Sequence, residues 1–145
     1  MSQVIYRELT SLPATLDELE QESVRAGFSM VTRLRSGWES NTNRFQEPGE
    51  VLCAAFRGQK LIGTAGLNCD PYLEDLSVGR LRHVYVLEGE RRSGVGKALV
   101  QQVLAHAAGN FKVVRLSTAR ASLFYDSLGF NRAEGEHVTH VLPLE

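Results

Sequence analysis

The stretch GERRSGVGKALVQQVL, residues 89–104, brings two arginines and three glycines to the start of a predicted helix. A helix N-terminus offers unpaired N–H groups and about half a positive charge. Gly94 and Gly96 have no Cβ atom, so an anion can approach their backbone closely. Arg91 or Arg92 can add charge-assisted hydrogen bonds. We therefore expect the N–H groups of this turn to converge on one phosphate group. The alternative is a solvated turn whose glycines only cap the neighbouring elements.

Two common nucleotide-binding motifs do not fit this turn. A P-loop has the pattern GxxxxGK(S/T), but here Gly94 is followed by Val95 instead of lysine. The dinucleotide-binding pattern GxGxxG fails as well, because Leu99 occupies the place of its third glycine. The sequence therefore favours a phosphate-bearing ligand of another class.

The turn is embedded in an alternation of apolar stretches that predicts an α/β protein of the α+β layered type. We expect strands at 3–9, 51–56, 60–68, 80–88, 111–118 and 137–144, and helices at 15–34, from 94 and at 121–129. The first helix has an S/T-x-x-E capping box at Thr15 and Glu18, and is either continuous or broken near Gly27. Residues 51–68 form an antiparallel hairpin. We expect the sheet to be mostly antiparallel and residues 1–145 to form one domain.

Two sequence motifs resemble a known family. RRSGVG at 91–96 is similar to the R/Q-x-x-G-x-G/A pyrophosphate turn of the GNAT (GCN5-related N-acetyltransferase) family, and FYDSLGF at 124–130 resembles its FYEKLGF signature. The order of elements agrees over nearly the whole chain. The resemblance implies a mixed, mostly antiparallel sheet of six to seven strands with about four helices. It also implies that acetyl-CoA is the co-substrate and that no metal is needed.

By this resemblance, the strand at 81–86 diverges from the parallel strand that follows it, and its free backbone groups, here those of Val84 and Val86, bind the pantetheine arm. The pyrophosphate lies on the turn, and the family often has an asparagine where this chain has Thr118. The residues implied to contact the co-substrate are Val84, Tyr85, Val86, Arg91, Arg92, Ser93, Gly94, Val95, Gly96, Lys97, Thr118, Ala121 and Phe124.

The resemblance also implies a catalytic role for Tyr125, whose hydroxyl points toward the sulfur of CoA. A phenol with a pKa near 10 can donate a proton or a hydrogen bond to a thiolate whose conjugate acid has a pKa of about 8.5. The alternative is an aromatic core residue beside Phe124. Because Leu123, Phe124 and Leu128 already supply a packing stripe, we favour the catalytic role. Gly129 is expected to end this helix in the left-handed conformation, with Phe130 packed back on it.

Attack by an amine requires loss of its proton, because an alkyl ammonium has a pKa near 10.4. His83 is the candidate base in the strand at 80–88, since its reference pKa is about 6.5. Strict alternation would place it on one face with Leu81 and Tyr85. Glu74 and Asp75, in the loop before this strand, and a chain of waters are the alternatives.

The sequence says less about the part of the site that would bind the amine acceptor. Arg80 and Arg82 either hold an acidic group of the acceptor or are solvated at the end of a strand. Residues after the first helix can line a substrate lip, and the candidates are Arg33, Arg35, Trp38 and Phe45.

The two cysteines are not expected to take part in catalysis, and His137 and His140 are not expected to bind a metal ion together. Cys53 and Cys69 lie outside them, which predicts free thiols and no acyl-cysteine intermediate. His137 and His140 are three residues apart and would point to opposite faces of a strand, so we expect no shared metal ion.

Charge and hydropathy narrow the functional classes further. The net charge of −1 predicts no general attraction to nucleic acid or to an anionic membrane. We see neither a signal peptide nor an apolar run of about 18 residues, so we expect a cytoplasmic protein, either a monomer or a homodimer. The prediction is an N-acetyltransferase that acts on a primary amine of a small molecule or peptide. A CoA-binding sensor with little turnover is the alternative.

Overall fold

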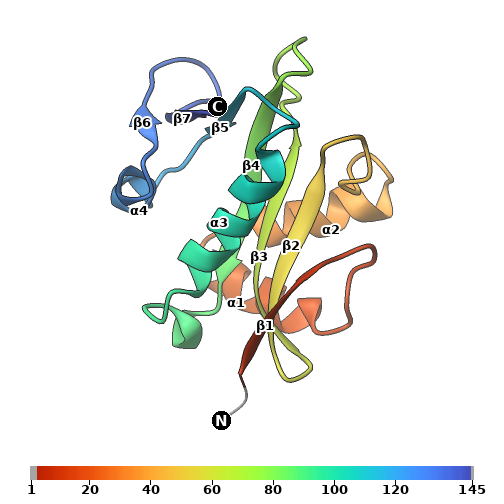
Figure 1. Ribbon diagram of the computed structural model, residues 1–145. Helices are drawn as coiled ribbons and strands as arrows, with labels where there is room; N and C mark the ends of the chain where they lie inside the picture. Colours follow the sequence, from red (N-terminus) through yellow and green to blue (C-terminus); the bar gives the residue numbers. More distant parts are fainter. Residues whose placement is uncertain (1–2, 145) are drawn as a thin grey trace.

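The computed structural model describes residues 3–144, and in this range it has seven strands and four α-helices (Figure 1). In chain order they are β1 (Val4–Glu8), α1 (Leu16–Arg25), α2 (Met30–Glu39), β2 (Val51–Arg57), β3 (Lys60–Cys69), β4 (Val78–Val86), α3 (Val95–Ala107), β5 (Val113–Leu116), α4 (Ser122–Ser127), β6 (Asn131–Arg132) and β7 (His140–Pro143). A single 3₁₀ turn, Glu88–Glu90, lies between β4 and α3.

All seven strands belong to one sheet in the order β1-β2-β3-β4-β5-β7-β6. The β4–β5 pair is parallel and the other pairs are antiparallel, which confirms the predicted mixed, mostly antiparallel sheet. Strand β6 was not predicted, because two residues are too few to give an alternating pattern. Within the described residues, no helix combines the length and the apolar character needed to cross a membrane.

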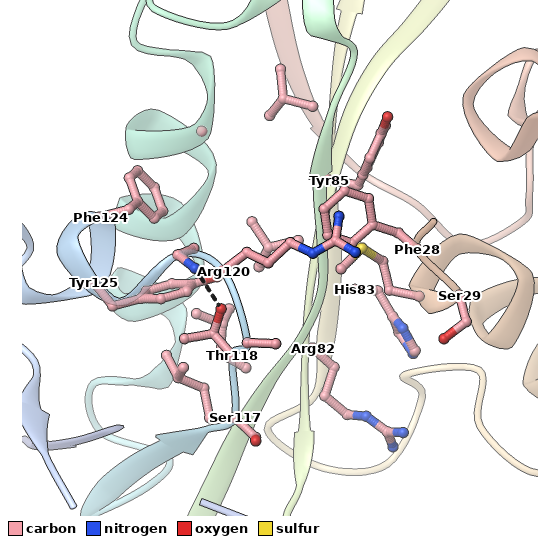
Figure 2. Close-up of a pocket in the computed structure, with 18 of the residues that line it drawn as sticks. Phe28, Ser29, Arg82, His83, Tyr85, Ser117, Thr118, Arg120, Phe124 and Tyr125 are labelled. Atoms are coloured by element: carbon pink, nitrogen blue, oxygen red, sulfur yellow. Dashed lines mark hydrogen bonds between the residues drawn. The ribbon is translucent and has the colours of Figure 1, made fainter. Parts of the chain in front are cut away.

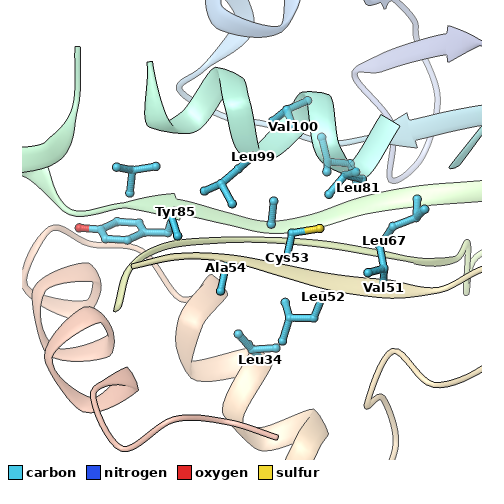
Figure 3. Packing of buried hydrophobic residues seen from close by; sticks show 14 of the residues in the cluster. Leu34, Val51, Leu52, Cys53, Ala54, Leu67, Leu81, Tyr85, Leu99 and Val100 are labelled. Atoms are coloured by element: carbon cyan, nitrogen blue, oxygen red, sulfur yellow. The ribbon is translucent and has the colours of Figure 1, made fainter. Parts of the chain in front are cut away.

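Helices cover both faces of the central strands. Helix α3 lies on one face, and α1 and α2 lie on the other (Figures 1 and 3). Strands β2 and β3 are buried on both faces, so they are apolar almost throughout and do not alternate. Leu99 and Val100 of α3 pack from above in Figure 3, and Leu34 of α2 packs from below.

The first predicted helix is two helices. Helix α1 ends at Arg25, Gly27 adopts a left-handed φ of +87°, and α2 continues to Glu39, beyond the predicted end. The predicted capping box is wrong. Thr15 is the N-cap residue but its side chain makes no capping hydrogen bond, and its hydroxyl accepts one from the N–H of Leu61 at 3.3 Å. This bond joins the start of α1 to the start of β3.

Strand β4 contains a bulge that the sequence did not reveal. The β3–β4 register shifts between Thr64 and Gly66, and His83 has a left-handed φ of +58°. The predicted alternation is therefore wrong. Leu81 lies on the α3 face (Figure 3), whereas Tyr85 reaches α1 and His83 packs on the α2 side.

Beyond the bulge, β4 has a free edge. Strand β5 pairs with it only from Val78 to Arg80, so the later residues of β4 have no partner on that side. The expected divergence of the two parallel strands is confirmed. Val84 falls in neither register, which leaves its backbone groups open toward the space between the strands.

Candidate active site

A cleft of about 1070 Å³ follows the free edge of β4 (Figure 2). Its walls are the α1–α2 loop, the turn before α3, and residues 116–121 between β5 and α4. Each predicted catalytic residue, Tyr125 and His83, lines it. So do the predicted co-substrate residues, namely Val84, Tyr85, Val86, Arg91, Arg92, Gly94, Gly96, Lys97, Thr118, Ala121 and Phe124.

Two predicted contacts do not line this cleft. The side chain of Val95 is buried in the core, and the hydroxyl of Ser93 donates to the carbonyl of Glu90 at 2.8 Å. The Ser93 hydroxyl proton is therefore already in use, so the donors that these two residues can offer an anionic ligand are their backbone N–H groups.

The turn before α3 has the backbone of an anion site. Arg92 has a φ of +69° and Gly94 a φ of +87°, so two left-handed residues alternate with ordinary ones. Such alternation points successive N–H groups into one concavity. Gly94 is the N-cap of α3 without a side-chain cap, and the first intrahelical bond runs from the N–H of Ala98. A Cβ added to Gly94 would meet no protein atom within 4 Å, so the protein leaves the space beside this turn open.

Arg91 has a structural role in this turn. Its Nε donates to the carbonyl of Val86 at 2.9 Å, and its guanidinium lies 5.2 Å from the centre of the Tyr85 ring. The Val86 carbonyl is therefore already bonded, contrary to the expectation that it is free for the pantetheine. Val84 keeps its open backbone groups, and Arg92 has no side-chain partner in the described chain.

Tyr125 faces the cleft from α4, opposite β4 (Figure 2). Its ring packs edge-on against Phe124 and Phe130, at centroid distances of 5.0 and 5.7 Å. Burial raises the pKa of its phenol, and the hydroxyl has no hydrogen-bond partner in residues 3–144. The packing stripe inferred from sequence is wrong at Leu123, which is 79% exposed, whereas Phe124 and Leu128 pack against the core and Tyr125 itself is buried. Gly129 has the expected left-handed φ, +93°.

Thr118 also lies at the cleft, but its oxygen is already in use. It accepts a hydrogen bond from the N–H of Ala121 at 3.1 Å, drawn as the dashed line in Figure 2. This bond orders the turn that leads into α4 and so positions Tyr125. The Thr118 hydroxyl proton is still able to reach a ligand.

The Acetyltransferase (GNAT) domain family matches residues 48–132, which include β4, the turn and all of α4 with its tyrosine. This chain is a GNAT protein. No curated protein sequence is significantly similar to it.

Solved structures with similar folds include other members of this class. A protein of Exiguobacterium sp. 255-15, provisionally assigned as an acetyltransferase, is 28% identical with a TM-score of 0.88, over 97% of this chain and 93% of that one. The YhbS GNAT family N-acetyltransferase of Escherichia coli, solved with CoA, is 17% identical with a TM-score of 0.73, over 100% and 83%. A GNAT family acetyltransferase of Staphylococcus aureus Mu50 is 17% identical with a TM-score of 0.70, over 97% and 100%.

In this GNAT protein, His83 is a neutral residue of the cleft wall. Burial lowers its pKa to about 3, and the neighbouring charges of Arg82 and Arg33 add to the effect. Its ring also lies edge-on to Phe45, at a centroid distance of 5.8 Å. A group with this pKa is almost entirely unprotonated at pH 7. His83 can therefore accept a hydrogen bond from the amine substrate, but it cannot hold the proton that the amine loses.

The low pKa of His83 predicts acid sensitivity of folding. Between pH 3 and 6.5 the unfolded chain binds a proton at this residue that the folded chain does not, so the free energy of unfolding falls as the pH falls. From pH 7 to pH 5 the loss from this residue is about 2 kcal/mol. In His83→Asn, which tolerates the left-handed backbone, that part of the loss should disappear. Urea unfolding of both proteins at pH 7 and pH 5 measures it, and equal pH dependence would contradict the assignment.

The two acidic candidates for the base are misplaced. Glu74 and Asp75 are exposed in the loop before β4 and do not line the cleft. Asp75 accepts hydrogen bonds from the N–H and hydroxyl of Ser77, which lower its pKa. Glu22 of α1, which sequence analysis missed, accepts a 2.7 Å bond from the Tyr85 hydroxyl, and burial together with this bond raises the pKa of Tyr85 to about 12.

Only one predicted lip residue reaches the cleft. Arg33 lines it, whereas Trp38 and Phe45 are buried in the core and Arg35 pairs with two acidic residues of α1. Sequence analysis missed the α1–α2 loop and the residues before α4, because no motif marks them. The missed lining residues include Phe28, Ser29, Met30, Ser117 and Arg120.

Arg120 spans the cleft between these two segments (Figure 2). Its guanidinium lies 4.5 Å from the centre of the Phe28 ring, and its Nη1 donates to the carbonyl of Ala26 at 3.2 Å. The contact joins residues more than 90 positions apart, so it depends on the fold and has no local signal in the sequence.

The remaining predicted residues have structural surroundings. Cys53 is buried with its pKa raised to about 11, Cys69 is also a free thiol, and neither lines the cleft. His140 bonds Asp126 at 3.0 Å, while His137 stacks on Tyr72 at 3.8 Å. Within residues 3–144, no group of three or more His, Cys, Asp or Glu side chains is placed to hold a metal ion.

Proposed function

We propose that this GNAT protein transfers the acetyl group of acetyl-CoA directly to a primary amine of a small molecule or peptide. The observation that carries the proposal is the arrangement of one cleft. It joins an anion-binding turn, the free edge of β4 and an unpartnered tyrosine hydroxyl. The family assignment supports the same chemistry.

The residues present fit acetyl-CoA. The open concavity at Gly94 and the positive charges of Arg92 and Lys97 suit a pyrophosphate, and the open backbone of Val84 suits the amides of pantetheine. When bound, acetyl-CoA would supply the activated acetyl thioester.

Side chains of the cleft would carry out the remaining steps of the reaction. Tyr125 would donate a hydrogen bond to the leaving sulfur, because burial keeps its phenol protonated. His83 would orient the amine as a neutral acceptor of a hydrogen bond. The amine proton would pass to water, since no carboxylate lines the cleft in the part of the chain that the structure describes.

Calorimetric titration with acetyl-CoA, CoA and ATP tests the first half of the proposal. Micromolar affinity for the two CoA compounds, well ahead of ATP, is the expected result. Absence of CoA binding would overturn the proposal. Release of CoA in a screen of primary amines then separates an enzyme from a CoA-binding sensor, which would bind the compound without turnover.

A further inference from the structure

The charges that line the cleft are unusually one-sided. Seven basic side chains and no carboxylate belong to the described residues of its wall, although the whole chain is slightly acidic. These basic residues are Arg33, Arg80, Arg82, Arg91, Arg92, Lys97 and Arg120. A pyrophosphate would account only for the group near α3, so the other end of the cleft needs a separate explanation.

Most of these charges have a role within the chain or at the turn. Arg91, Arg92 and Lys97 belong to the anion-binding turn, and Arg120 is bonded to the α1–α2 loop. Arg80 is buried, with Nη1 3.4 Å from the carboxylate of Asp70 and its guanidinium 4.8 Å from the ring centre of Tyr72.

Two arginines at the far end have no such partner. Neither Arg82 nor Arg33 forms an ion pair or side-chain hydrogen bond with any residue from 3 to 144. Asp70, the acid whose charge acts on Arg82, already lies within 3.4 Å of Arg80 and Arg115. The sequence left open whether the arginines of β4 are solvated. Arg80 instead forms an ion pair inside the protein, whereas Arg82 is available to bind an anion.

Arg82 is held in an unfavourable environment when the cleft is empty. It is half-buried, and burial with repulsion from Arg80 and Arg33 lowers its pKa despite partial compensation by Tyr72 and Asp70. A desolvated charge without a counter-ion is costly, and a bound anion would remove that cost. The guanidinium fork matches the two oxygens of a carboxylate or phosphate.

The position of Arg82 connects this charge to the reaction. It precedes His83 and the open Val84 on β4, and Figure 2 shows Arg82 and His83 leaving the strand on the side away from Tyr125. Arg33 approaches from α2, which packs on β4. An anion bound by these two arginines would therefore lie at the acceptor end of the cleft and not at the pyrophosphate end.

We infer that the acceptor is an anionic amine, whose carboxylate or phosphate group is held by Arg82 and Arg33. This rests on the proposed acetyl transfer and names its substrate class. Amino-acid-like or phosphate-bearing amines fit the cleft, whereas polyamines and lysine-rich peptides meet repulsion from its basic wall.

The test uses pairs of acceptors in which a neutral group replaces the anionic one. CoA release is measured with amino acids against their amides, and with O-phosphoethanolamine against ethanolamine. Binding is measured separately by calorimetry, in the presence of CoA, with N-acetyl amino acids against N-acetyl amino acid amides. For at least one pair, the anionic compound should have a kcat/KM and an affinity at least tenfold higher than those of its neutral partner. Comparison of the phosphate pair with the carboxylate pairs shows which of the two anions the cleft binds.

Variants assign the preference to the residues. Arg82→Gln and Arg33→Gln should each reduce the anionic preference to threefold or less. Arg25→Gln, which removes an exposed arginine of α1 outside the cleft, should leave it unchanged. Equal use of anionic and neutral amines, or a preference that survives Arg82→Gln, would overturn the inference while acetyl transfer stands. Loss of acetyl-CoA binding in the wild type would overturn both.

Discussion

Replacing Gly94 with valine should weaken acetyl-CoA binding about 10³-fold. The added side chain would occupy the concavity of the turn, where no protein atom now lies within 4 Å of the Cβ position. Loss of two charge-assisted hydrogen bonds at 1.5–3 kcal/mol each accounts for an effect of this order. The φ of +87° adds strain for a β-branched residue, so the free energy of unfolding should also fall by about 1–2 kcal/mol.

Gly109 offers a matched control at the other end of α3. Its φ is +86°, and a Cβ there would likewise meet no protein atom within 4 Å, but it does not line the cleft. Gly109→Val should therefore lose the same stability and keep its affinity for acetyl-CoA. Urea unfolding and calorimetry separate the two effects. Similar affinities for acetyl-CoA in the two variants would show that the turn before α3 is not the pyrophosphate site.

The parts of the site that the sequence predicts are those built by neighbours in the chain. Glycines, arginines and an apolar stripe within 16 residues define the turn and α3, and the structure has both where they were expected. The hairpin β2–β3 and the divergence of β4 from β5 were also predicted, the first from local pattern and the second from family resemblance.

The features that were missed depend on contacts between distant segments. The bulge in β4 places a histidine, not a glycine, at a φ of +58°, so no local signal marks it. It separates Leu81 from His83 and Tyr85, which strict alternation placed on one face. Helix α4 has only six residues, too few for its periodicity to show that Leu123 is exposed and Tyr125 buried. The link between Arg120 and Phe28 likewise exists only in the folded chain.

The second large effect is expected at Tyr125. Tyr125→Phe should lower kcat about 10²- to 10³-fold and leave the affinity for acetyl-CoA nearly unchanged. The substitution removes only the hydroxyl, which has no partner within residues 3–144, and it keeps the ring contacts with Phe124 and Phe130. The protein should therefore fold as before, and the loss should appear only when negative charge develops on the leaving sulfur. Turnover kinetics and calorimetric titration of both proteins measure the two quantities.

The raised pKa of Tyr125 decides how its hydroxyl acts. Complete proton transfer from a phenol whose pKa lies above its usual value to a thiolate of ordinary basicity, with a conjugate-acid pKa of about 8.5, is uphill, so donation of a hydrogen bond is the favoured role. Wild-type kcat should then show no decline from Tyr125 ionisation up to pH 10, whereas a phenol of ordinary pKa would begin to lose its proton there. Tyr6→Phe, on β1 and away from the cleft, should keep full activity. Equal kcat in wild type and Tyr125→Phe would refute the role, and a selective loss of acetyl-CoA affinity would make the hydroxyl a binding group instead.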